Sequence, residues 1–451
     1  MVKTIFGTDG ARGVANRDLT PELVLKIVKS GGYLLSKDIE SPFFVVGKDT
    51  RCSGDMIEGA VIAGLCSVGA SVINVGILPT AGIAYLTRRL NAAGGIVISA
   101  SHNPIEYNGI KFFDSRGFKL SDEMEKTIET FLEEKITLPV GKGIGRVKIL
   151  DRAEDLYIEY LKEKIGTRLE GIRVVVDCAY GAAYRVAPAV FDILGADVLS
   201  INNAPLGEKI NVNCGATHPE VIRDKVKDVP SSIGVSFDGD ADRVVLADEE
   251  GNILNGDYIL ALWGIELLKR GELKNNTVVG TIMSNLGLEE ALASHGATLL
   301  RAEVGDRYVL EKMFHSDSVI GGEPSGHIVY LPGTTTGDGI FTSLMVLKIL
   351  KEKDKPLSAF RGIIPKYYPQ ISRNIRVRNK YGIMEDTKMK DLIAKVDRLL
   401  IGKGRSIIRA SGTEDFIRVT LEGEDDFFMK ELINEIEEEI RKIDNAYNRL
   451  V

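Results

Sequence analysis

The stretch Ile233-Gly234-Val235-Ser236-Phe237-Asp238-Gly239-Asp240-Ala241-Asp242-Arg243 is an apolar run that ends abruptly in an acidic turn. The chain repeats this arrangement twice, because apolar runs also precede the polar turns at 99–104 and 322–327. Short apolar runs bounded by turns are typical of buried strands, and open α/β sheets bind ligands in the loops beyond the carboxyl ends of their strands. The recurrence therefore predicts three similar α/β domains that each contribute one loop to a common site.

Segments with a helical spacing of apolar residues alternate with these runs, for example at 21–35 and 56–68. This alternation predicts an α/β protein with mainly buried strands. The last segment differs, because strand-like runs at 406–409 and 417–421 lie between helical stretches, which predicts a smaller α+β domain. The domain limits that we expect from these patterns are 1–152, 153–250, 251–364 and 365–451.

The composition restricts the class of protein. The chain has 57 Lys and Arg against 64 Asp and Glu, a net charge of −7, which gives no sign of a nucleic-acid partner. Its four cysteines show no CxxC spacing, so we expect reduced thiols rather than disulfides or a zinc site. We see neither a signal sequence nor an apolar run of about 18 residues. We therefore expect a cytoplasmic protein without a membrane partner.

The acidic turn is the strongest candidate for a metal site. Asp238, Asp240 and Asp242 occupy every second position, and carboxylate oxygens suit a hard cation such as Mg²⁺. One alternative is a solvated turn. The other is a calcium loop, for which Glu249 stands at position twelve, but position six is Arg243 where such loops require glycine. The pattern therefore favours Mg²⁺, with a phosphate oxygen as a further ligand.

Ser101 is a candidate nucleophile, because it follows an apolar run and lies in a turn with small residues before it. A serine in a turn is more often a local hydrogen-bonding group, and the chain has no Gly-x-Ser-x-Gly motif of an α/β-hydrolase. The neighbouring His102 and the nearby Lys111 offer groups for proton transfer or for neutralising a phosphate.

Three further turns carry groups that suit a sugar phosphate. The turn at 323–327 combines a carboxylate, a hydroxyl and an imidazole, which can recognise sugar hydroxyls, although a polar surface turn has the same composition. Arg409 and Arg418 flank two hydroxyl residues and a glycine, as expected of a phosphate cradle. The glycine-rich segment at 6–13 contains Arg12 and is a weaker signal.

The four loops at 99–104, 238–243, 322–327 and 409–418, in this order along the chain, resemble those of the α-D-phosphohexomutase family, and the resemblance extends along essentially the whole chain. It implies three α/β domains with mixed sheets and a smaller α+β C-terminal domain, with all four loops around a central cleft. It also implies an enzyme that transfers a phosphoryl group within a hexose phosphate through a phosphorylated serine.

The resemblance further implies a role for each loop. Ser101 would carry the phosphoryl group, and one of its phosphate oxygens would join Asp238, Asp240 and Asp242 as ligands of Mg²⁺. Other catalytic roles around the reacting oxygens fall on Arg12, Lys111, His102 and His327. Substrate-binding roles, for the sugar hydroxyls or the phosphate that is not transferred, fall on Glu323, Ser325, Arg409, Ser411, Gly412, Thr413, Arg418 and Arg243.

Four runs are most similar to family members that act on glucosamine phosphates, at 6–13, 214–220, 304–309 and 335–339. The resemblance thus implies interconversion of glucosamine 6-phosphate and glucosamine 1-phosphate, priming by a sugar 1,6-bisphosphate, and a homodimer. One departure is Asp415, where relatives commonly have proline; its carboxylate is expected to affect anion binding or sugar preference.

Three alternatives remain open at this point. The first is a mutase of the same family that prefers glucose or mannose phosphates. The second is a phosphosugar-binding protein without catalytic activity. The third is a metal-dependent phosphatase, which would release free phosphate.

Overall fold

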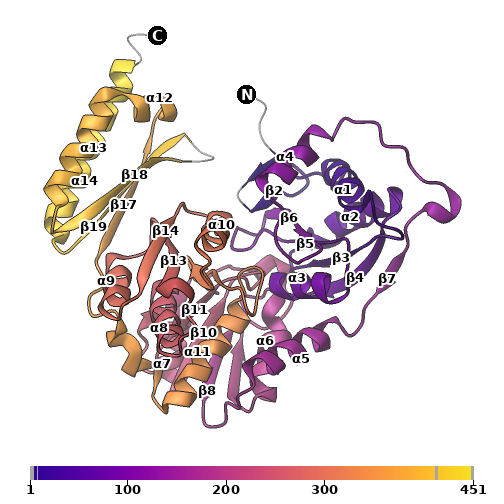
Figure 1. The fold of residues 1–451 in the computed structure, drawn as a ribbon, viewed down its shortest axis with the longest axis horizontal. Helices are drawn as coiled ribbons and strands as arrows, with labels where there is room; N and C mark the ends of the chain where they lie inside the picture. The colour runs from indigo at the N-terminus through magenta and orange to yellow at the C-terminus, as the bar shows by residue number, and fades with distance from the viewer. Residues whose placement is uncertain (1–4, 8, 412–414, 448–451) are drawn as a thin grey trace.

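The computed structural model describes residues 5–7, 9–411 and 415–447. Figure 1 shows four domains that follow one another along an arc, from the first domain at the right to the C-terminal domain at the upper left. The first three contain mixed sheets flanked by helices, and the fourth has an antiparallel sheet. The α/β architecture with a smaller α+β C-terminal domain, which we expect from the sequence, is thus confirmed.

The first domain contains a seven-stranded sheet in the order β1-β2-β6-β5-β3-β4-β7. Strands β5, β3, β4 and β7 run parallel, whereas β6 and β2 are antiparallel to their neighbours. The strands are β1 (Phe6–Gly7), β2 (Gly10–Val14), β3 (Phe43–Lys48), β4 (Ser71–Ile77), β5 (Gly94–Ile98), β6 (Tyr107–Asp114) and β7 (Val147–Ile149). The helices are α1 (Pro21–Ser36), α2 (Gly54–Ser67), α3 (Thr80–Arg89) and α4 (Asp122–Thr130).

Local sequence explains why these helices form where they do. Helix α1 begins after Thr20, whose hydroxyl accepts a hydrogen bond from the N–H of Leu23, and Pro21 occupies its first turn. Both features favour a helix start. One face of α1 buries Val24, Ile27 and Val28, as its apolar spacing predicts.

The second domain has a five-stranded sheet in the order β12-β11-β10-β8-β9. Its elements are α5 (Ala153–Ile165), β8 (Arg173–Asp177), α6 (Val186–Ile193), β9 (Asp197–Ile201), α7 (Pro219–Asp228), β10 (Ser232–Phe237), β11 (Val244–Ala247) and β12 (Ile253–Leu254). Because β12 pairs with β11, the second sheet extends beyond the division at 250 that we expect from the sequence. The four domain limits stay a proposal.

The third domain has a four-stranded sheet in the order β14-β13-β15-β16. Its elements are α8 (Gly256–Lys269), β13 (Thr277–Thr281), α9 (Leu286–Ser294), β14 (Thr298–Ala302), α10 (Asp306–Ser316), β15 (Ile320–Gly322), β16 (Ile328–Tyr330) and α11 (Gly339–Lys353). The fourth domain contains β17 (Gln370–Arg376), α12 (Lys380–Glu385), α13 (Thr387–Leu400), β18 (Gly404–Ala410), β19 (Phe416–Gly423) and α14 (Asp426–Tyr447), with β19 in the middle of its sheet.

The hydrophobic cores show how the domains are joined. One buried cluster includes Val45 of the first domain, Val174 of the second and Val278 of the third. The C-terminal domain has its own cluster around Ile375, Val419 and Ile433. Because burial of apolar surface is the main stabilising contribution, the first three domains form one packed unit to which the fourth is attached.

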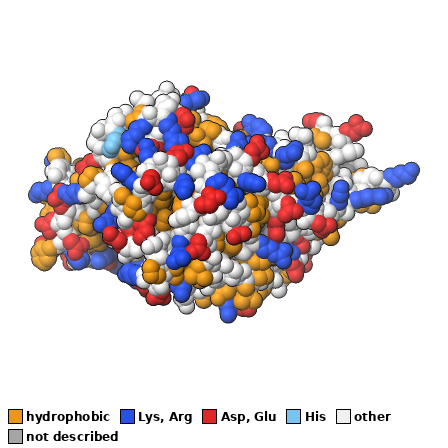
Figure 2. Space-filling view, turned by 90° about the horizontal axis from the view of Figure 1, so that it is seen from below, with side chains coloured by type: hydrophobic (Ala, Val, Ile, Leu, Met, Phe, Trp, Pro, Cys, Tyr) orange, Lys and Arg blue, Asp and Glu red, His pale blue; other side chains and the backbone are white. Residues whose placement is uncertain are grey.

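The surface is mixed in charge. Figure 2 shows acidic and basic side chains interspersed over the face that it displays. No helix among the described residues is both long enough and apolar enough to cross a membrane.

Candidate active site

Ser101 lies in the loop that follows β5, and its side chain points at the second domain. Its hydroxyl donates a hydrogen bond to Oδ2 of Asp238 at 2.7 Å, and the residue is 1% exposed. The backbone of Ser101 has a φ of 51°, in the left-handed region that few serines adopt. The structure thus places the candidate nucleophile beside the candidate metal ligands.

Asp238, Asp240 and Asp242 form a buried cluster of carboxylates in the loop after β10. Each side chain offers an oxygen within 4.8 Å of the others. Burial, followed by repulsion from Asp242 and Asp240, raises the pKa of Asp238 well above its ordinary value. Three carboxylates are held close together at a cost in free energy, which a cation would offset.

The donor atoms of this cluster fit a hard cation. Oδ2 of Asp240 accepts hydrogen bonds from Thr80 Oγ1 at 2.6 Å and from Lys111 Nζ at 2.8 Å. In contrast, Oδ1 of Asp240 and Oδ1 of Asp242 are buried and have no hydrogen-bond partner among the described residues. Buried polar atoms normally find a partner, and carboxylate oxygens are the preferred ligands of Mg²⁺ and Ca²⁺. The cluster can therefore hold a divalent metal ion.

Lys111 is a buried cation at the centre of the site. It lies on β6, is 1% exposed, and forms ion pairs with Asp240, Asp242 and Asp9 at 2.8, 3.2 and 3.1 Å. Burial alone would lower the pKa of Lys111, but the surrounding carboxylates outweigh it and hold the pKa well above its ordinary value. The ammonium group therefore stays charged next to the Ser101 loop.

Arg12 and His102 lie close to the same loop. Arg12, on β2, donates to the side chain of Asn103 at 2.9 Å and pairs with Asp9. Nδ1 of His102 lies 3.3 Å from the hydroxyl of Ser101. Burial, together with Arg243 and Arg12, lowers the pKa of His102 to about 4. At neutral pH the imidazole is therefore uncharged.

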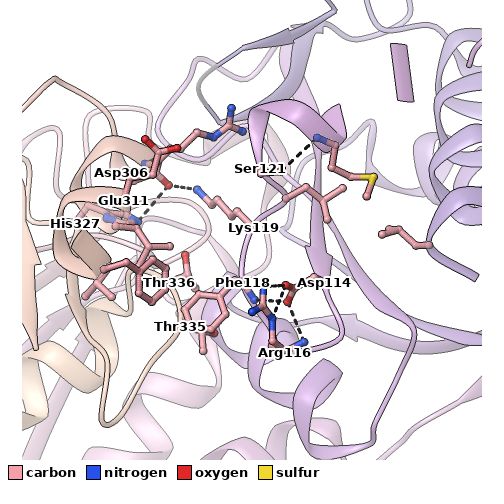
Figure 3. Close-up of a pocket in the computed structure, with 17 residues that line it drawn as sticks. Asp114, Arg116, Phe118, Lys119, Ser121, Asp306, Glu311, His327, Thr335 and Thr336 are labelled. Carbon is pink, nitrogen blue, oxygen red and sulfur yellow. Dashed lines mark hydrogen bonds and ion pairs between the residues drawn. The ribbon is translucent and has the colours of Figure 1, made fainter. Parts of the chain in front are cut away.

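His327 and Arg243 connect the second and third domains, because they pair across an isolated antiparallel bridge. Nε2 of His327 lies 3.8 Å from Asp306 and 4.0 Å from Asp242. Figure 3 shows that Lys119 and His327 both point toward Asp306. This group borders a cavity of about 390 Å³ between the first and third domains.

The turn at 323–327 follows β15 and lies against the second domain. Oε1 of Glu323 accepts a hydrogen bond from the N–H of Gly305 at 3.1 Å, and the side chain is buried. Ser325 is exposed. The backbone N–H of Val244, which follows the metal loop, donates to the carbonyl of Gly326, so the turn is fixed next to that loop.

The C-terminal domain supplies two arginines at neighbouring strand positions. Arg409 on β18 is paired in register with Arg418 on β19. Burial, followed by repulsion from Arg418, lowers the pKa of Arg409 below its ordinary value, while Glu303 of the third domain acts in the opposite direction. Two cations side by side are stabilised by an anion, so this pair can bind a phosphate.

The loop between β18 and β19 contains the other residues predicted to bind this phosphate, and the structure describes only part of it. Ser411 is buried and its N–H donates to the carbonyl of Phe416 at 2.8 Å, whereas Gly412 and Thr413 lie outside the described residues. Asp415 is exposed, and its carbonyl accepts a hydrogen bond from Val377.

Several residues that the sequence analysis did not identify also belong to the site. Asp9 pairs with Lys111 and Lys119, and Asp306 pairs with Lys119. The guanidinium of Arg51 donates to backbone carbonyls of the Ser101 loop. Asp9 occurs within the glycine-rich segment at 6–13, and Asp306 occurs within a run that we singled out for its resemblance alone, while Arg51 and Lys119 gave no local signal.

Family domains match along nearly all of the chain. Phosphoglucomutase/phosphomannomutase alpha/beta/alpha domains I, II and III match residues 3–138, 155–251 and 255–367, and the C-terminal domain matches residues 373–442. A protein named phosphoglucosamine mutase from Thermoanaerobacter sp. (strain X514) is 50% identical over 442 residues, which cover 97% of this chain and 99% of that protein.

Solved structures share the fold. A phosphoglucomutase/phosphomannomutase family protein from Burkholderia thailandensis has a TM-score of 0.83 at 22% identity, with 98% of each chain covered. An N-acetylphosphoglucosamine mutase from Aspergillus fumigatus, in complex with GlcNAc-6P and magnesium, has a TM-score of 0.69 at 18% identity, over 97% of this chain and 96% of that chain. With the four matched domains and the identity over almost the full length, the chain belongs to the α-D-phosphohexomutase family.

Proposed function

We propose that the chain interconverts glucosamine 6-phosphate and glucosamine 1-phosphate through a phosphorylated Ser101. The observation that carries the proposal is the hydrogen bond between Ser101 and Asp238, which places a hydroxyl at the edge of a buried carboxylate cluster. The choice of sugar is supported by the phosphoglucosamine mutase that is 50% identical to this chain.

The proposed reaction has two transfers. In the first, a P–O bond to O1 of glucosamine 6-phosphate forms as the P–O bond to Oγ of Ser101 breaks, and the hydroxyl proton of O1 is transferred through a nearby base to Oγ. In the second, a P–O bond to Oγ of Ser101 forms as the P–O6 bond of the 1,6-bisphosphate breaks, and the Ser101 hydroxyl proton is transferred to O6, which leaves glucosamine 1-phosphate. A sugar 1,6-bisphosphate would prime Ser101 at the start.

Phosphoryl transfer depends mainly on positioning and on neutralising negative charge. We assign neutralisation to Lys111 and Arg12, because both are cations fixed beside the Ser101 loop. We assign proton exchange with Oγ of Ser101 to His102, because Nδ1 of its ring lies 3.3 Å from that oxygen. His327 lies farther from Ser101 and is assigned to the charge network with Asp306.

We propose that the metal is Mg²⁺, held by Asp238, Asp240, Asp242 and a phosphate oxygen on Ser101. When bound, it would neutralise charge on the phosphate oxygens. The Oδ1 atoms of Asp240 and Asp242, which have no hydrogen-bond partner among the described residues, support the assignment, as does the magnesium in the Aspergillus fumigatus structure.

We assign the sugar and the second phosphate to the remaining loops. Glu323 and Ser325 would bind sugar hydroxyls, with Arg243 beside them. Arg409, Ser411, Gly412, Thr413 and Arg418 would bind the phosphate that is not being transferred. The arginine pair supports this assignment, because its mutual repulsion is relieved by an anion. We also propose a homodimer, on the family resemblance, and a cytoplasmic location, on the scattered cysteines expected to be reduced thiols.

The test compares three sugars with one protein preparation. Protein primed with glucose 1,6-bisphosphate is incubated with Mg²⁺ and the 6-phosphate of glucosamine, glucose or mannose. We expect the highest kcat/KM for glucosamine 6-phosphate and no release of free phosphate. A higher kcat/KM for glucose or mannose would contradict the sugar assignment, release of phosphate would indicate a phosphatase, and binding without conversion would indicate a phosphosugar-binding protein.

A further inference from the structure

The backbone of Ser101 is held by hydrogen bonds to three side chains. Its N–H donates to Oγ of Ser99 at 2.8 Å. Its carbonyl oxygen accepts two hydrogen bonds, from Nη2 of Arg51 at 2.9 Å and from Nδ2 of Asn211 at 2.8 Å. The backbone N–H and carbonyl of Ser101 are thus both hydrogen-bonded to side chains. Its Oγ remains available to donate a hydrogen bond to Asp238.

Arg51 binds the whole loop rather than one residue. Its guanidinium, which is buried, also donates to the carbonyls of Pro104, Tyr107 and Asn103 at 2.6, 2.9 and 2.7 Å. Nε of Arg51 pairs with Asp49 at 3.0 Å. A planar, permanently charged group with several donors is suited to fixing a loop in one shape.

Asp49 extends this network to the strand end. Oδ2 of Asp49 accepts a hydrogen bond from Oγ of Ser99 at 2.6 Å, and Ser99 in turn accepts from the N–H of Ser101. The network therefore reaches both sides of the Ser101 peptide. A left-handed backbone is unfavourable for serine, and these contacts offset that cost.

Asn211 makes the second attachment, and it comes from the other domain. It lies in the second domain, as does Asp238, so one domain contacts both the carbonyl and the hydroxyl of Ser101. Gly239 allows this approach, because a Cβ atom there would lie 2.7 Å from the carbonyl oxygen of Ser101. These two hydrogen bonds from the second domain, made by Asn211 and Asp238, fix both the position and the direction of the Ser101 hydroxyl.

We propose that Arg51 and Asn211 are positioning residues that clamp the carbonyl of Ser101 and so align its Oγ with the metal site, a role that rests on the phosphoserine mechanism proposed above. They touch the carrier loop, not the sugar-binding turn. Misplacement of a reacting group by about 1 Å costs on the order of a hundredfold in rate. Their removal should therefore lower kcat and leave KM almost unchanged.

The main test uses Asn211→Gly, because Asn211 has a φ of 60° and glycine adopts this conformation without strain. We expect kcat to fall by about ten- to a hundredfold and KM for the hexose 6-phosphate to stay within about twofold. The matched control is Asn213→Gly, since Asn213 is exposed and has a φ of 50°. A wild-type kcat in Asn211→Gly, or a raised KM with unchanged kcat, would overturn the clamp.

A second variant tests Arg51 by chemical rescue. In Arg51→Ala, added guanidinium ion should restore part of kcat, whereas methylammonium should not, because only guanidinium reproduces the planar array of donors. Failure of guanidinium to restore kcat in the folded variant would count against the role of Arg51. If Arg51→Ala does not fold, Asn211→Gly alone decides the question.

The sugar with the fastest wild-type turnover is used in both tests. If the wild type turns over glucose or mannose phosphate but not glucosamine phosphate, the proposed substrate is wrong. The variants can then still be compared with the wild type on the sugar that it turns over, so the clamp is tested all the same. A wild-type protein that turns over no hexose phosphate would contradict the proposed function, and the clamp with it.

Discussion

Ser101 Oγ lies 2.7 Å from Asp238 Oδ2, although the two residues are 137 positions apart and belong to different domains. The loop after β5 thus meets the loop after β10 at a single hydrogen bond. Both side chains are buried, so the carrier hydroxyl lies directly against the carboxylate cluster and away from solvent.

Replacement of Lys111 should stop turnover while the protein remains folded. In Lys111→Met the side-chain length is kept, but Asp9, Asp240 and Asp242 lose a cation within 3.2 Å. We expect kcat to fall by at least about a hundredfold, because a fixed charge at a reacting phosphate is a large contribution. Lys142→Met, at an exposed position, is the control. A Lys111→Met enzyme with more than about a tenth of the wild-type kcat would argue against the assigned role.

Removal of divalent metal should abolish activity reversibly. Chelation with EDTA is expected to stop turnover, and Mg²⁺ should restore it. Asp240→Asn should weaken metal binding by at least about tenfold, because it replaces a charged ligand by an amide. Isothermal titration with Mg²⁺ measures this directly. Full activity after exhaustive chelation would be inconsistent with a role for the carboxylate cluster in metal binding.

Arg409 should affect substrate binding more than turnover. In Arg409→Ala one of the two neighbouring cations is lost, and we expect KM for the hexose 6-phosphate to rise by about ten- to a hundredfold, the usual contribution of a charged hydrogen bond. Arg376→Ala, at an exposed position of β17 in the same sheet, should leave KM unchanged. Steady-state kinetics check both. An unchanged KM in Arg409→Ala would exclude this arginine from the phosphate site.

Asp338 should make stability depend on pH. Its carboxylate caps α11 through the N–H of Phe341 and accepts a hydrogen bond from Tyr157 at 2.6 Å, and burial raises its pKa to about 6. Because the folded state binds this proton more tightly than the unfolded state, the contribution to stability decreases as pH rises from about 4 to 6 and is constant above.

Asp338→Asn removes this titration and keeps the shape of the side chain. Relative to the wild type, the variant should gain about 3 kcal/mol of stability between pH 4 and pH 7, the equivalent of a pKa shift of about two units. Thermal unfolding at a series of pH values measures the difference. Asp155→Asn, an exposed position in α5, is the control, and parallel curves for wild type and Asp338→Asn would disprove the assignment.

The fold and most of the loops could be predicted because their signals are local. The apolar run 233–237 and the acidic turn after it form β10 and the carboxylate cluster, as expected. Helix α1 begins at Pro21, the start that its apolar spacing predicts. Strand β12 has only two residues, which is too few to show an alternation of apolar and polar side chains. Its place in the second sheet is therefore not indicated by the sequence alone.

Arg51 and Asn211 could not be found in the same way. Arg51 contacts Asn103, 52 positions away in the chain, and Asn211 contacts Ser101, 110 positions away. In the sequence, an arginine or an asparagine in a turn looks like any residue of a solvated loop. Asp9 was within a quoted motif, but its pairing with Lys111 depends on how β2 and β6 lie side by side. Such contacts are set by the tertiary fold and leave no periodic pattern.

The most direct test of the account is the transfer of phosphate through Ser101. Intact-protein mass is recorded after priming with glucose 1,6-bisphosphate and again after glucosamine 6-phosphate is added, for the wild type, Ser101→Ala and the exposed-site control Ser115→Ala. We predict that the wild type and the control gain one phosphate and form glucosamine 1-phosphate, whereas Ser101→Ala does neither. Conversion by Ser101→Ala at a rate close to that of the wild type would contradict the phosphoserine mechanism.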